Sequence, residues 1–202
     1  MAKNASYCTP FRRRREGKTD YRTRRAFIVS GRPRLTVRTS TNNVTAQLIV
    51  ARPHGDEVLV STHSRELAGK HGWKAPRGNL PAAYLTGFLC GQKAKTQGVE
   101  EAILDIGLKS PSKGARVFAV LKGVLDAGVE IPYSEEKLPD QKSIEGEHIA
   151  KYAESLVSNP DVYQRKFSKY LEQKLSPETL TKHFAEVKAD IVAAFESGGK
   201  KK

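Results

Sequence analysis

The first 38 residues carry most of the net charge of this chain, and that asymmetry constrains its fold more than any other feature. They hold twelve Lys and Arg residues against Glu16 and Asp20, a net charge of +10 out of +13 for the whole chain. The four consecutive arginines at 12–15 cannot lie in a core, because unpaired buried charge costs too much free energy. The sequence therefore predicts a basic arm, residues 1–31, whose cations are solvated or bind a polyanion.

The residue types in the arm favour RNA as that polyanion. Ten of the twelve cations are Arg, and aromatic residues such as Phe11 and Tyr21 stand between them. Arginine binds phosphate through two parallel hydrogen bonds and stacks on bases, and aromatic rings stack on unpaired bases. We expect an arm that is disordered when free, orders on RNA, and binds more weakly as salt rises. The alternative interpretation is a solvated basic tail or a nuclear-localisation-like run.

Composition excludes several other classes of protein. Cys8 and Cys90 are the only cysteines and have no pattern around them, which argues against a disulfide scaffold, a cysteine-rich zinc site and a secreted protein. The longest run without charge, residues 78–92, contains Pro81 and is too short to span a bilayer. The N-terminus does not have the pattern of a signal peptide. We expect a soluble cytoplasmic chain with no membrane partner.

Hydrophobic periodicity predicts a small sheet after the arm. Residues 34–38, 44–50 and 57–62 alternate apolar and polar side chains, as half-buried strands do. Turn residues at 41–43 and 53–56 separate them, so the three strands should form an antiparallel meander. The first strand places Arg34 and Arg38 on one face, which we interpret as a surface that faces RNA.

A helical hairpin and a fourth strand should complete the core. Asn79 as N-cap and Pro81 in the first turn predict a helix that runs to about Gln97. The small residues Gly87 and Gly91, four apart, predict close approach of another backbone. A buried strand at 101–106 lies between this helix and a second helix after residue 114, which predicts a parallel crossover. Residues 64–78 are expected to be irregular.

These elements define an α/β fold with three regions. The core, residues 32–133, is a small mixed sheet in the order β-β-β-α-β-α, with a three-stranded antiparallel meander and one parallel strand. Residues 134–202 form a helical C-terminal extension, because apolar residues recur there at helical spacing in three stripes.

We find no catalytic or metal-binding pattern. Glu101 and Asp105 are four apart on a predicted strand, over 13 Å apart at about 3.3 Å per residue, too far to share a metal ion. The three histidines between residues 54 and 71 have no cysteine or acidic ligand in register. The sequence therefore predicts no enzyme, no cofactor, no metal and no small-molecule substrate.

Two further basic groups allow two interpretations each. Trp73 with Lys74 and Arg77 would stack on RNA and clamp it, or the indole anchors a local cluster of apolar side chains. Lys113 and Arg116 flank a predicted helix start that would hold an anion through free amides, or form an ordinary first turn.

Several motifs in a fixed order resemble a known family. They are FRRRREGKTDY at 11–21, PRLTVR at 33–38 followed by residues 42–50, AILDIGL at 102–108, FAVLKG at 118–123, DAG at 126–128 and IPYSE at 131–135. Together they resemble the L-eighteen family of large-subunit ribosomal proteins (universal uL-eighteen) over about residues 5–157. The arginine arm and the helical extension resemble its archaeal branch.

The resemblance implies a structural protein of the cytoplasmic ribosome. It implies binding to 5S rRNA, contact with 23S rRNA at the central protuberance, and neighbouring large-subunit ribosomal proteins as further partners. The candidate RNA-binding residues are Arg12, Arg13, Arg14, Arg15, Lys18, Tyr21, Arg22, Arg24, Arg25, Arg32, Arg34, Arg38, Asn42, Asn43, Trp73, Lys74, Arg77, Lys113 and Arg116. An RNA-processing nuclease on a ribonuclease-H-like sheet and a basic architectural DNA-binding protein are the alternatives.

Overall fold

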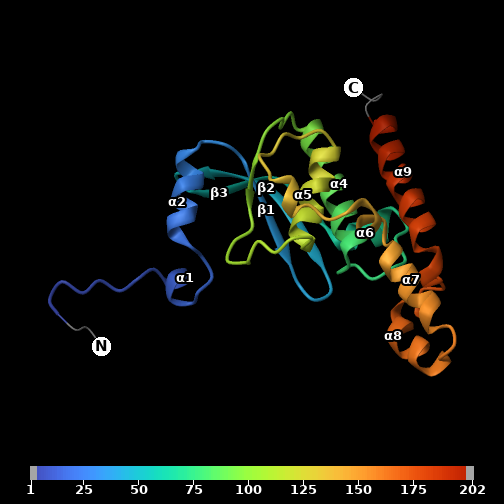
Figure 1. Cartoon of the computed structure of the whole chain (residues 1–202). Helices are drawn as coiled ribbons and strands as arrows, with labels where there is room; N and C mark the ends of the chain where they lie inside the picture. The colour runs from blue at the N-terminus through green and yellow to red at the C-terminus, as the bar shows by residue number, and fades with distance from the viewer. Residues whose placement is uncertain (1–3, 199–202) are drawn as a thin grey trace.

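A four-stranded mixed sheet forms the centre of the molecule in a computed structural model that describes residues 4–198. Its strands are β1 (Arg34–Thr39), β2 (Val44–Arg52), β3 (Gly55–His63) and β4 (Ile103–Asp105), in the order β3-β2-β1-β4 (Figure 1). The first three strands are antiparallel and β4 is parallel to β1. The predicted meander and its parallel fourth strand are therefore confirmed.

The fourth strand is shorter than predicted. Glu101 makes only an isolated bridge to Glu130, and the amide of Ala102 donates to the Glu130 carbonyl. The chain thus pairs with the segment after the second core helix before it reaches β1, which limits β4 to three residues.

Helices α4 (Leu80–Thr96) and α5 (Arg116–Asp126) cover one face of the sheet. The Asn79 side chain caps α4 by accepting from the Ala82 amide at 2.9 Å, as predicted. The two helices touch through glycine: a Cβ at Gly87 would lie 2.1 Å from the Val120 carbonyl oxygen, and one at Gly123 would lie 2.3 Å from that of Tyr84. The predicted close approach of two backbones is confirmed, and α5 is the helix that approaches.

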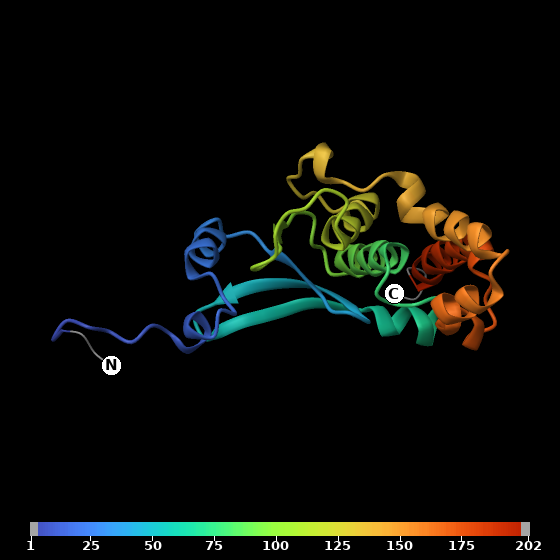
Figure 2. The same ribbon diagram turned by 60° about the horizontal axis from the view of Figure 1, so that its bottom comes forward.

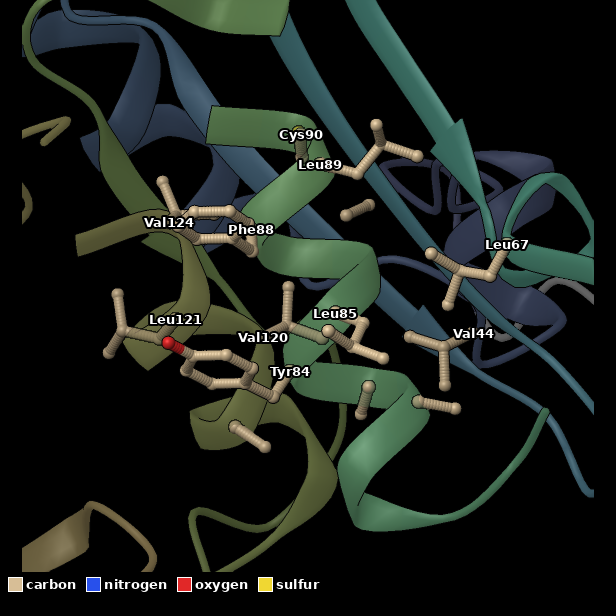
Figure 3. Packing of buried hydrophobic residues seen from close by; sticks show 14 of the residues in the cluster. Val44, Leu67, Tyr84, Leu85, Phe88, Leu89, Cys90, Val120, Leu121 and Val124 are labelled. Carbon is tan, nitrogen blue, oxygen red and sulfur yellow. The ribbon is translucent and has the colours of Figure 1, made fainter. Parts of the chain in front are cut away.

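The core lies between the sheet and this helix pair. Leu35 and Val37 of β1 and Leu48 of β2 are fully buried. Figure 3 shows Leu85 of α4 on the same side of the helix as Val44 and Leu67, while Leu121 and Val124 of α5 lie on the other side of α4. Burial of these side chains supplies the main driving force for folding.

The segment predicted to be irregular contains a helix. Helix α3 (Ser64–Lys70) follows β3 directly, capped by His63, whose side chain accepts from the Arg65 amide at 3.1 Å. The Glu66 carboxylate accepts from the His63 amide at 3.0 Å, which completes a capping box. The prediction was wrong because Gly69 and Gly72 disfavour a helix, whereas the cap from the His63 side chain stabilises its start.

The C-terminal extension is helical and packs on the core. It comprises η1 (Glu135–Lys137), α6 (Gln141–Glu145), α7 (Glu147–Leu156), α8 (Pro160–Glu172), η2 (Pro177–Thr179) and α9 (Leu180–Gly198). Phe184 and Ile191 of α9 and Phe167 of α8 are buried in the same hydrophobic cluster as the sheet. The Phe184 ring lies 5.6 Å from that of Tyr84 on α4. Residues 199–202 of the predicted extension, and 1–3 of the arm, lie outside the described residues.

The arm forms two helices, α1 (Arg12–Arg15) and α2 (Tyr21–Val29), whereas we expected disorder in the free chain. Neither helix has a buried residue. Figures 1 and 2 show both helices at one end of the sheet and the C-terminal helices at the other.

Candidate nucleic-acid interface

The arginine run forms one exposed helical turn, α1. All four of its side chains are exposed. Arg13 donates from Nε to the Thr19 hydroxyl at 2.8 Å. Arg14 and Arg15 make no hydrogen bond or ion pair through their side chains within residues 4–198. Their guanidinium groups are therefore free to bind phosphate.

Helix α2 adds two more exposed cations, Arg22 and Arg25. Asp20 caps it by accepting from the amides of Arg22 at 2.9 Å and Thr23 at 3.3 Å. The hydrogen bond from the Thr23 hydroxyl is the main cause that lowers the pKa of Asp20. The side chains of Arg22 and Arg25 extend into solvent, and neither has an ion pair among the described residues.

Acidic side chains neutralise some other cations of the arm. Lys18 pairs with Glu16 at 2.9 Å, and Arg12 approaches the same carboxylate at 3.9 Å. Arg32 pairs with Glu101 at 3.4 Å. Both partners are substantially exposed in each pair, so the pairs are weak and a phosphate group can replace the carboxylate.

Arg24 attaches α2 to the sheet. Its Nη1 and Nη2 donate to the two carboxylate oxygens of Asp56 at 2.9 and 2.7 Å. This hydrogen-bonded pair lowers the pKa of Asp56 and raises that of Arg24. Asp56 stands at the start of β3, so the pair fixes the arm against the β2–β3 hairpin.

Arg34 is buried within this ionic network, contrary to the prediction that it faces RNA. Only 3% of the residue is exposed, and its Nη2 and Nη1 lie 3.0 Å from Asp56 and 3.4 Å from Asp105. A guanidinium between two carboxylates fulfils a structural role. Arg38, on the same face of β1, keeps an exposed side chain and donates to the Asp105 carbonyl at 3.0 Å.

A cleft of about 500 Å³ separates the arm from the sheet. Among the side chains that line it are Arg13, Lys18, Tyr21, Arg24, Phe27, Arg34, Thr36, Arg38, Asp56 and Asp105. The structure thus gathers six of the predicted RNA-binding residues around one polar space: Arg13, Lys18, Tyr21, Arg24, Arg34 and Arg38. The carboxylates of Asp56 and Asp105, which the sequence did not assign to this surface, line the same space.

Other predicted residues lie at the opposite end of the sheet. Asn42 is exposed in the β1–β2 turn, and Lys74 and Arg77 lie across a second cleft from it. Asn43 is a turn residue whose side-chain oxygen accepts from the Ser64 hydroxyl at 3.4 Å. The side chains predicted to contact RNA therefore form two separate groups.

Trp73 does not offer a surface for stacking. It is 3% exposed, and its ring stacks on that of His183 with 5.2 Å between centroids. Its Nε1 points to the Pro76 carbonyl oxygen at 3.5 Å. The prediction of a base platform is wrong, and the alternative of a local apolar anchor is confirmed.

The start of α5 has little capacity to hold an anion. The Gly114 amide donates to the Lys137 carbonyl at 3.1 Å. Arg116 donates from Nη1 to the carbonyls of Ser40 and Gly78, both at 2.8 Å. Arg116 is therefore occupied as a link between two loops, while Lys113 is exposed and has no ion pair among the described residues.

Sequence reasoning missed one basic residue of the second cleft, Lys169 on α8. No local signal identifies it, because α8 reaches the 73–79 loop only through packing of the C-terminal helices. The Asp105 carboxylate lies 3.4 Å from both Arg34 and Arg38 and balances their charge.

Within residues 4–198, no three His, Cys, Asp or Glu side chains are grouped so that they could hold a metal ion. Burial raises the pKa of the Cys90 thiol to about 11, so this cysteine is a poor nucleophile. None of the described helices has both the length and the apolar character that a membrane span requires.

A small α/β domain that carries exposed, unpaired arginines beside its sheet has the surface of a polyanion-binding protein. The family model described as "Ribosomal large subunit proteins 60S L5, and 50S L18" matches residues 5–100 and 91–134, well over half of the chain, and the chain belongs to this family. It is therefore a protein of the large subunit of the cytoplasmic ribosome, in a family whose role is structural and whose partners are rRNA and other ribosomal proteins. The archaeal branch stays a prediction.

Proposed function

We propose that this protein binds 5S rRNA and anchors it to 23S rRNA at the central protuberance of the large subunit. The observation that carries the proposal is the set of guanidinium groups on α1 and α2 that have no ion pair within residues 4–198, those of Arg14, Arg15, Arg22 and Arg25. These arginines lie on two helices in which no residue is buried. Helices of this kind gain stability from a ligand rather than from a core.

The way the arm is attached supports this role. The pair between Arg24 and Asp56 holds α2 at the edge of the sheet while leaving the other arginines outward. Folded RNA presents phosphates on both sides of a groove, and a short basic helix with cations all around it can contact both sides at once. Arg38 and Lys18 extend the same basic surface toward the sheet.

The test is filter binding of the full chain to 5S rRNA, tRNA and duplex DNA of similar length, each at several NaCl concentrations. We expect the tightest binding to 5S rRNA, with a log–log salt slope that corresponds to several phosphate contacts, each contributing about −0.7 to −0.9. Equal affinity for all three polyanions would contradict the proposal and favour an architectural DNA-binding protein. Mg²⁺-dependent cleavage of the RNA would favour a nuclease.

A further inference from the structure

A second basic cleft, which we call the 41–77 cleft, lies at the end of the sheet opposite the arm. It has a volume of about 650 Å³ and lies between the β1–β2 turn, the 73–79 loop and α8. Its polar lining consists of Thr41, Asn42, Lys74, Arg77, Asn79, Lys169, Glu172 and Gln173. Three cations and one carboxylate give the lining a net charge of +2.

The three cations are available to a ligand. The side chains of Lys74, Arg77 and Lys169 make no hydrogen bond or ion pair with any residue in the described part of the chain. Glu172 is one helical turn from Lys169 but forms no ion pair with it within residues 4–198. Three unpaired cations around one concave space would repel one another, and an anion in the cleft relieves that repulsion.

Contacts with α8 and α9 hold the 73–79 loop, which forms one wall of the cleft. Trp73 stacks on His183, whose Nε2 accepts from the Lys74 amide at 3.1 Å. Asn79 donates to the Tyr170 hydroxyl at 3.3 Å, which ties the loop to α8.

The turn and the loop also touch each other directly. A Cβ at Gly78 would lie 2.4 Å from the Thr41 carbonyl oxygen, and Arg116 bridges the two segments. Such a preformed site loses little entropy when it binds.

We infer that the 41–77 cleft is a second RNA-binding site, which holds a phosphodiester backbone through Lys74, Arg77 and Lys169. The inference rests on the proposed function and deepens it. It assigns a role to the C-terminal extension, because Lys169 comes from α8 and because α9, through His183, supports the loop that carries Lys74.

The lining favours RNA over an acidic protein. Protein interfaces depend on exposed aromatic or aliphatic anchors. Here the indole of Trp73 is 3% exposed and Ala75 is 5% exposed, so the cleft offers charge and hydrogen-bonding groups instead. The side chains of Thr41 and Asn42 stand exposed at the turn, where they suit hydrogen bonds to phosphate or ribose oxygens.

The 41–77 cleft and the arm lie at opposite ends of the sheet. Figure 2 shows the arm helices at one end of the strands and α7 to α9 at the other. The 41–77 cleft and the arm therefore contact different segments of RNA, as a protein that joins two RNA elements requires.

The experiment compares two double variants of the full chain. Lys74→Gln with Lys169→Gln removes two cations from the cleft, and Lys166→Gln with Lys182→Gln removes two exposed cations outside its lining. Binding to 5S rRNA and, separately, to 23S rRNA is measured by filter retention from 0.05 to 0.3 M NaCl, and thermal melting checks that each variant is folded.

We expect the cleft variant to bind at least one of the two rRNAs about tenfold more weakly, with a salt slope shallower by about 1.4 to 1.8 for two lost phosphate contacts. The control variant should change affinity by less than about twofold.

Equal losses in the two variants would overturn the inference, because general charge would then explain them. Unchanged binding of both rRNAs by the cleft variant, alongside a loss when Arg14 and Arg15 are changed to Gln, would also overturn it while the proposed function stands. If the arginine variant binds 5S rRNA as the unaltered chain does, the proposed function fails, and the two lysine variants still decide whether the cleft contacts RNA. A photoreactive amino acid at position 42 that cross-links only to protein in assembled subunits would likewise exclude RNA as the occupant.

Discussion

The two ends of this molecule are both helical, yet different forces hold them. Helices α1 and α2 have no buried residue, and the bidentate ion pair between Arg24 and Asp56 attaches α2 to the sheet. Helices α7 to α9 place a row of apolar side chains in the common core, including Phe167, Leu180, Phe184 and Ile191. The arm is thus attached by charge, and the C-terminal extension by hydrophobic burial.

The two ends also differ in net charge. Residues 1–38 have a net charge of +10, whereas residues 135–202 contain twelve basic and twelve acidic side chains and are neutral. A neutral amphipathic helix gains stability by packing, while a strongly basic one without a buried face needs a polyanion. RNA binding and folding stability are therefore carried largely by separate segments, and five predictions test this separation.

The largest effect should follow from Phe184→Ala in α9. The ring is 3% exposed and packs on Tyr84, so its loss leaves a cavity and should lower the free energy of unfolding by about 3 to 5 kcal/mol. Urea denaturation followed by circular dichroism measures this. A loss below about 1 kcal/mol would mean that the extension is not part of the core.

A large effect on binding, with none on folding, should follow from changing Arg14, Arg15, Arg22 and Arg25 together to Gln. Four lost phosphate contacts should weaken 5S rRNA binding by about a hundredfold or more near 0.15 M salt and make the salt slope shallower by about 2.8 to 3.6. The melting temperature should stay within a few degrees, because these side chains have no partner among the described residues. Loss of cooperative unfolding in this variant would contradict the separation of RNA binding from folding stability.

A smaller effect should follow from Arg24→Gln, which removes the pair that holds α2. Both side chains are about one third exposed, so the free energy of unfolding should fall by about 0.5 to 1 kcal/mol. Hydrogen exchange of the α2 amides should speed up more than that of α4. Equal protection of α2 in both proteins would show that another contact holds the arm.

The same pair predicts how acid acts on the arm. Arg24 lowers the pKa of Asp56 below its usual 3.8 in the folded protein, so the unfolded chain binds a proton at higher pH than the folded chain does. The contribution of the pair is therefore complete above pH 4 and is lost as the pH falls through the folded pKa. Arg24→Gln should show a shallower fall of stability below pH 4 than the unaltered chain.

Local patterns predicted most of the fold but only part of the candidate site. Alternation along β1 and β2, and the cap at Asn79, depend on neighbours in sequence, so they could be predicted from the residues alone. Arg34 was misplaced because alternation gives the face of a strand but not what covers that face. Asp56 and Asp105, which bury its guanidinium, come from two other strands.

The second cleft shows the same limit. Trp73 and Lys74 could be singled out by their residue types, but His183, which buries the indole, lies on α9. Lys169 approaches the cleft only when α8 packs beside Asn79. Contacts between segments far apart in sequence depend on tertiary packing, which periodicity does not encode.

The smallest effect should be a pH dependence at the C-terminal end, carried by His183. Burial lowers the pKa of His183 below its usual 6.5, while Glu186, 3.7 Å from Nδ1, opposes that shift and Lys74 adds to it. The neutral ring is also required to accept from the Lys74 amide at Nε2. The unfolded chain therefore binds a proton first as pH falls, and stability should be complete above pH 6.5 and decrease below it. Urea denaturation at pH 7.5 and 5.5 should show this decrease in the unaltered chain and a smaller one in His183→Gln, with His54→Gln as the exposed control. The ordinary pKa of a histidine, 6.5, lies above that of an aspartate, 3.8, so His183 should begin to lose its contribution at a higher pH than Asp56. Mild acid should therefore loosen the extension while the arm stays attached, and the reverse order would contradict the assignment of the two ends.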